Sequence, residues 1–175
     1  MSEEKDSKTI PNILQNLQSK NEGIVLKALD DVKNKGNEKV LATLLDLLFT
    51  SKSEAVISKI KTILFELKSS KAGDIIIDYL QKEISAGHRD VLVSALWQSG
   101  IACEEHLTLL VQLACDENYL TTLEVLTVVE NLEGVLNEEE VMECIYTVNE
   151  ALSDSEDEEK SKLLQSLAQV LEQIR

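Results

Sequence analysis

Residues 88–100 read HRDVLVSALWQSG and have the pattern of one amphipathic helix. Gly100 follows at the position where helices commonly end with a residue in the left-handed conformation. The pattern therefore predicts a helix over residues 88–100 that ends at Gly100. The residues of its predicted inward face are spaced as on one side of a helix, and they are Val91, Leu92, Ala95, Leu96 and Ser99.

Nine further segments show the same helical spacing, and short polar links join them. Only 3% of the residues are aromatic and there is one proline, which favours an all-α protein over a β-sandwich. Residues 1–8 are polar and are expected to form a disordered tail, and residues 9–175 to form a single domain. Five of the nine helices are expected over Thr9–Leu17, Asn21–Lys35, Ala72–Ile84, Glu104–Ala114 and Asn118–Leu132. Three more are expected to begin at Asn37, Ser53 and Asn137, and Glu140 completes a capping box at the last of these starts. The final helix is expected to begin at Ser153 or Asp154 and to end at Ile174.

The helices also repeat along the chain. Equivalent apolar positions recur at offsets of 32, 35 and 28 residues, in Ile24/Ala28, Val56/Ile60, Val91/Ala95 and Tyr119/Leu123. Helix pairs with a period of this length are typical of α-solenoids. The pattern resembles HEAT or armadillo-like repeats over residues 10–174, with the nearest local match in DVLVSALWQSG, residues 90–100. This resemblance implies an α-solenoid of about five antiparallel helix pairs wound into a right-handed superhelix. An up-and-down helical bundle is the alternative.

The net charge of −15 is confined to the C-terminal half. Residues 1–87 contain 13 lysines and 13 acidic residues, whereas residues 88–175 contain 4 basic and 19 acidic residues. Between Arg89 and Lys160 there are 18 acidic residues and no lysine or arginine. Such a surface would repel a phosphate backbone, so a nucleic-acid partner is not expected. A basic segment of another protein is the partner that this charge favours.

Few residues suggest catalytic or metal chemistry. Cys103, His106 and Cys115 are the strongest cluster, but they lack the second ligand pair that a zinc site needs and the third group that a Cys–His nucleophile needs. Neither His88 nor His106 is followed by glutamate, unlike the His-Glu dipeptides of di-iron hydroxylases with HEAT-like repeats. We therefore expect no enzyme activity, no metal, no cofactor and no small-molecule substrate.

The chain is expected to be cytoplasmic. No apolar run approaches the length of a membrane span, and the start of the chain is polar where a secretory signal would be apolar. Three scattered cysteines agree with a reducing compartment.

Two features predict a partner-binding surface. Val93 and Trp97 lie opposite the inward face of their helix, and the position of Trp97 is polar in earlier repeats, although a central helix could bury the indole instead. The acidic residues of the last two helices lack compensating lysines, although favourable helix-dipole interactions or solubility could also explain them. The predicted surface comprises Val93, Trp97, Glu124, Glu138, Glu139, Glu143, Glu150, Asp154, Glu156 and Asp157.

These features favour a non-catalytic scaffold or adaptor for protein–protein interaction. Its acidic C-terminal repeats would bind a basic, or mixed basic and apolar, segment of a partner. A structural subunit of a larger assembly is the main alternative. A small helical-repeat enzyme or lyase, with His88 or His106 as acid or base, is a further one.

Overall fold

The computed structural model describes residues 3–35, 38–67 and 70–174, and these ranges are helical without a strand. The chain divides into two compact units, Met1–Gly87 (unit 1) and His88–Arg175 (unit 2). The sequence predicts one domain over residues 9–175, and this stays a prediction beside the division into two compact units. The boundary falls at the residue where the charge balance of the sequence changes.

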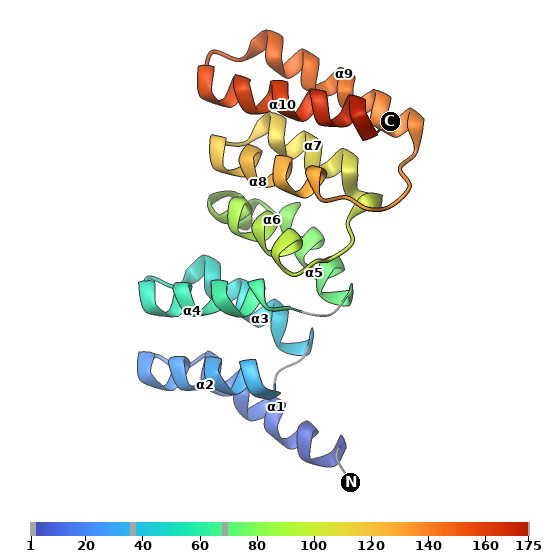
Figure 1. The fold of residues 1–175 in the computed structure, drawn as a ribbon. Helices are drawn as coiled ribbons and strands as arrows, with labels where there is room; N and C mark the ends of the chain where they lie inside the picture. Colours follow the sequence, from blue (N-terminus) through green and yellow to red (C-terminus); the bar gives the residue numbers. More distant parts are fainter. Residues whose placement is uncertain (1–2, 36–37, 68–69, 175) are drawn as a thin grey trace. The chain divides into compact units, whose positions relative to one another are not determined.

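The described residues of unit 1 form five α-helices and most of a short 3-10 helix that ends at His88 (Figure 1). They are α1 (Glu3–Leu17), α2 (Glu22–Lys35), α3 (Glu38–Thr50), α4 (Glu54–Phe65), α5 (Ser70–Leu80) and the 3-10 helix η1 (Glu83–His88). Helix α1 packs on α2 and α3, α2 packs on α4, and α3 packs on α4 and α5. The core is leucine- and isoleucine-rich, with fully buried Leu29, Leu45, Leu48, Ile60, Leu64 and Ile76.

Two details of unit 1 differ from the sequence expectations. Helix α1 begins at Glu3, within the predicted disordered tail, because glutamate and lysine readily extend a helix beyond its apolar segment. The predicted start of α3 at Asn37 lies outside the described residues. Helix α5 ends at Leu80, short of the predicted Ile84, and η1 follows it. Ser53 caps α4 as expected, since its side chain accepts a hydrogen bond from the Val56 N–H.

Over residues 88–174, unit 2 has five α-helices and one 3-10 turn (Figure 1). They are α6 (Arg89–Gln98), the 3-10 turn η2 (Glu104–His106), α7 (Leu107–Asp116), α8 (Tyr119–Glu130), α9 (Glu138–Asp154) and α10 (Glu158–Ile174). Helix α8 packs on α6, α7 and α10, and α9 packs on α7 and α10. No helix in the described part of the chain is both long and apolar enough to cross a membrane.

The end of α6 confirms the prediction made from residues 88–100. Gly100 has a φ of 61°, in the left-handed region. Its N–H donates to the Trp97 carbonyl at 3.1 Å, and the Ile101 N–H donates to the Leu96 carbonyl at 3.0 Å. These two bonds form a Schellman motif, which satisfies carbonyls that the helix leaves without a partner.

Asparagine and aspartate side chains begin the later helices. Asn118 accepts from the Thr121 N–H at 3.1 Å, and Asn137 accepts from the N–H groups of the first turn of α9, as predicted. The predicted start of α10 at Ser153 or Asp154 is wrong, because α9 continues to Asp154. Asp157 caps α10 instead, because one of its carboxylate oxygens accepts hydrogen bonds from the N–H groups of Glu159 and Lys160, both at 3.0 Å.

Side chains connect α7 and α9 at a constant offset. A Glu140 carboxylate oxygen accepts from the Thr108 hydroxyl at 2.8 Å and the Thr108 N–H at 3.4 Å. Seven residues further along both helices, the Cys115 thiol approaches the Thr147 carbonyl at 4.0 Å. Both pairs are 32 residues apart, so α7 and α9 run parallel. Glu140 therefore bonds a neighbouring helix, as well as lying in the predicted capping-box position.

Candidate interaction surface

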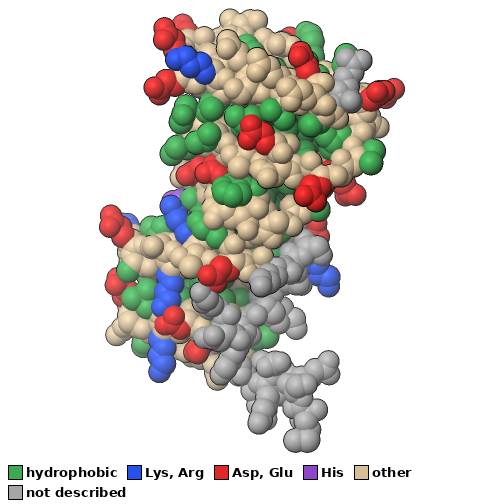
Figure 2. Space-filling view, in the orientation of Figure 1, with side chains coloured by type: hydrophobic (Ala, Val, Ile, Leu, Met, Phe, Trp, Pro, Cys, Tyr) green, Lys and Arg blue, Asp and Glu red, His purple; other side chains and the backbone are tan. Residues whose placement is uncertain are grey.

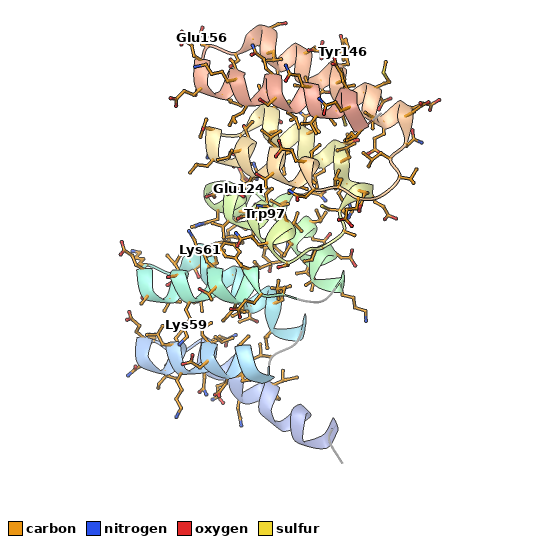
Figure 3. All side chains as sticks on the ribbon, viewed as in Figure 1. Lys59, Lys61, Trp97, Glu124, Tyr146 and Glu156 are labelled. Atoms are coloured by element: carbon orange, nitrogen blue, oxygen red, sulfur yellow. The ribbon has the colours of Figure 1, made fainter. Side chains whose placement is uncertain are left out.

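The structure brings Trp97 and Glu124 together. The indole of Trp97 on α6 is 38% exposed, and its Nε1–H donates to Glu124 Oε2 on α8 at 2.7 Å (Figure 3). This bond fixes the ring orientation with part of the ring in solvent. Trp97 thus combines the two alternatives left open by the sequence, since it packs against its own unit and still offers an exposed aromatic surface.

Val93 is buried, although the sequence predicts it to be part of the binding surface. Its side chain is 0% exposed, so the expectation that it faces a partner is wrong. The buried residues of α6 run without interruption from Val91 to Leu96. A helix that is apolar on nearly all sides is covered on nearly all sides, and its periodicity then marks no solvent face.

A cleft of about 320 Å³ lies beside Trp97, between the end of α6 and the end of α8. Glu104 lines it and accepts a hydrogen bond from the Gly134 N–H at 3.0 Å. A Cβ at Gly134 would lie 2.8 Å from this carboxylate, so glycine permits the close approach. The other lining residues are Gly100, Ile101, Ala102, Cys103, Val128, Asn131, Leu132 and Glu133.

The predicted acidic residues of α9 and of the start of α10 are all exposed, and Figure 2 shows acidic side chains on the drawn face of unit 2. Glu124 is half-buried. Two basic residues of unit 2 are engaged elsewhere, because Arg89 forms an ion pair with Glu117 and Lys160 donates to the Cys115 carbonyl. The exposed carboxylates are Glu138, Glu139, Glu143, Glu150, Asp154, Glu156 and Asp157.

Sequence reasoning missed two exposed apolar residues on α9. Met142 is 45% exposed and Tyr146 is 64% exposed, and they lie one helical turn apart. A signal was present in the sequence, because at 100° per residue Val141, Ile145 and Val148 share one side of the helix and both exposed residues lie away from that side. The Tyr146 hydroxyl donates to Glu150 Oε1 at 2.8 Å.

The cysteines are poor nucleophiles. Burial is the main cause that raises the pKa of Cys103 to about 11, and it likewise raises that of Cys115 to about 11. Burial also raises the pKa of Cys144. These thiols therefore stay protonated at neutral pH, and the thiolate is the reactive form. Within the described residues, no group of three or more His, Cys, Asp and Glu side chains is placed to hold a metal ion.

No protein-family model and no curated protein matches the chain. The surface of unit 2, with its exposed carboxylates, the Trp97–Glu124 pair and the apolar residues of α9, is the candidate interaction surface.

Proposed function

We propose that the chain is a non-catalytic protein-interaction module in which unit 2 binds a basic segment of another protein. The observation that carries this proposal is the exposure of the carboxylates of α9 and α10 in a unit with 19 acidic and 4 basic residues. A surface of one charge sign accelerates encounter with a segment of the opposite sign and selects against partners of the same sign. Nucleic acids and anionic membranes are in the disfavoured class.

The arrangement of helices supports a scaffold. In unit 2, α7 pairs with α8 and α9 pairs with α10, while α7 also contacts α9 and α8 also contacts α10. The shared offset of 32 residues between α7 and α9 agrees with the period seen in the sequence. We infer a HEAT-like solenoid, in which each pair packs mainly on the next pair and leaves extended surfaces for binding. Three free cysteines agree with a cytoplasmic protein.

Trp97 supports an apolar contribution to binding. Aromatic residues with a fixed orientation and an exposed face are common at the energetic centre of interfaces. A tryptophan face also attracts the ammonium or guanidinium group of a basic residue. The Glu124 carboxylate beside the ring adds to this preference for a cationic side chain.

The proposal is tested with a fluorescent lysine- and arginine-rich peptide and the full chain. A variant with Glu138→Gln, Glu139→Gln, Glu143→Gln and Glu150→Gln should weaken binding by about thirtyfold, if each exposed charge contributes about 0.5 kcal/mol. The matched control replaces four exposed acidic residues of unit 1, in Glu54→Gln, Asp74→Asn, Asp78→Asn and Glu83→Gln. Fluorescence anisotropy at low and high salt measures the dissociation constants.

The proposal requires wild-type binding that weakens as salt rises, and a much smaller effect of the control variant. Binding that does not respond to salt would contradict it. Equal losses in the two variants would also contradict it, because general attraction to a negative protein would then account for the binding. Absence of binding at low salt would rule it out.

A further inference from the structure

The outer side of α9 carries an apolar pair within the acidic surface. Met142 and Tyr146 are exposed and four residues apart, so their side chains are neighbours on one face of the helix. The opposite face holds the helix against its own unit through buried Val141, Cys144 and Val148. The exposed pair is therefore not part of the core that fixes α9. Figure 3 shows Tyr146 on this helix.

Carboxylates border the apolar pair along the helix. At 100° per residue, Glu139, Glu143 and Glu150 fall on one side of the Met142–Tyr146 line, and all three are exposed. On the same side, a cleft of about 600 Å³ lies among α7, α9 and α10, and its lining includes three carboxylates and one ammonium group, those of Asp116, Glu150, Asp154 and Lys160. We call Met142, Tyr146, Glu139, Glu143 and Glu150 the α9 face.

The two apolar side chains suit a binding surface for different reasons. The hydrogen bond from the Tyr146 hydroxyl to Glu150 restricts the ring before any partner arrives, so less side-chain entropy is lost on binding. Methionine is flexible and polarizable, and it adapts to the shape of an apolar partner. Large exposed apolar side chains with a polar border are characteristic of interaction sites.

We propose that the α9 face binds a basic amphipathic helix of another protein. Apolar side chains of that helix pack across Met142 and Tyr146, and its lysines or arginines pair with Glu139, Glu143 and Glu150. A helix is the favoured occupant because side chains four residues apart form a ridge that fits the grooves of a second helix. Charge complementarity selects a basic helix. This inference rests on the proposed function and specifies the partner and the face that it uses.

The test compares two peptides of about 18 residues and identical leucine and lysine composition. In one peptide the leucines form a single helical stripe, and in the other the same residues are scrambled. The full chain and the Met142→Ala/Tyr146→Ala variant are titrated into each labelled peptide. The control variant is Tyr119→Ala/Leu120→Ala, which removes two exposed apolar side chains of α8. Circular dichroism confirms that both variants remain helical and reports helix formation by the bound peptide.

The inference predicts that the striped peptide binds the wild-type chain about tenfold more tightly than the scrambled peptide. The Met142→Ala/Tyr146→Ala variant should lose this advantage and keep its salt-dependent affinity for the scrambled peptide. The control variant should keep both affinities. The bound striped peptide should gain helicity.

Other outcomes separate the two proposals. Equal binding of both peptides would overturn the α9 inference and leave salt-dependent binding of basic segments intact. Equal losses in the two double variants would also overturn the α9 face as the site. Tight binding of the striped peptide without gain of helicity would overturn the choice of a helix. Failure of both peptides to bind at low salt would refute the proposed function itself.

Discussion

Replacement of Gly100 by alanine should destabilise unit 2 through the backbone alone. Gly100 has a φ of 61°, and a Cβ built there meets nothing within 4 Å. The left-handed conformation costs a residue with a Cβ about 1–2 kcal/mol. Alanine also restricts the unfolded chain more than glycine does, which raises the free energy of unfolding by about 0.4–1 kcal/mol. The expected net loss for Gly100→Ala is therefore about 1 kcal/mol.

The assay uses the single tryptophan of the chain, which precedes Gly100 by three residues. Urea unfolding followed by Trp97 fluorescence reports on unit 2, because Trp97 belongs to that unit. A loss of about 1 kcal/mol corresponds to a drop of about 0.3–1 M in the urea midpoint, because the free energy of unfolding of small proteins falls by about 1–3 kcal/mol per molar urea. Gly100→Asn should lose less than Gly100→Ala, since asparagine tolerates the left-handed region better.

Gly87→Ala is the matched control. A Cβ at Gly87 also meets nothing within 4 Å, and its φ is not in the left-handed region. Circular dichroism should show its stability unchanged or raised by about 0.5 kcal/mol. The backbone argument is refuted if Gly100→Ala unfolds at the wild-type urea concentration, or if Gly100→Asn is less stable than Gly100→Ala.

Two further predictions concern buried side chains of unit 2. Val93→Ala should lower the free energy of unfolding by about 2 kcal/mol, because it removes buried apolar surface and leaves a cavity. Binding of a basic peptide should not change. Unchanged stability together with weakened binding would show instead that Val93 contacts the partner. The contribution of the Cys103 and Cys115 thiols to stability should be constant below about pH 9 and be lost between pH 9 and 11, because these thiols ionise at their ordinary pKa of 9.0 when unfolded and at about 11 when folded. Urea midpoints across this range should fall less steeply in a Cys103→Ala/Cys115→Ala variant, and an equal slope would assign the effect to other groups.

Local signals in the sequence predicted most helix ends. Gly100, Ser53, Asn118 and Asn137 act through hydrogen bonds to backbone groups a few residues away, so their neighbours along the chain are sufficient to identify them. The start of α10 was ambiguous because several acceptable capping residues occur between Ser153 and Asp157. How far α9 continues decides between them, and that depends on packing across the unit.

The exposure of the candidate surface residues depends more on tertiary contacts than the helix ends do. Glu139 and Glu143 are exposed, as expected, since long charged residues on a polar helix face rarely become buried. Val93 and Trp97 share one side of α6 by periodicity, yet one is buried and the other is half in solvent. Periodicity locates a face, but the size and position of the neighbouring helix determine whether that face is covered. Tyr146 illustrates the opposite case, an apolar side chain that the neighbours leave exposed.

The bond between Glu140 and Thr108 links the motions of two helix ends. One carboxylate lies in the first turn of α9 and accepts from an N–H in the first turn of α7. Unwinding of the first turn of α9 would withdraw that acceptor, and Thr108 would then lose its partner. We therefore expect amide hydrogen exchange in the two turns to be coupled, so that the opening of one end increases the opening of the other.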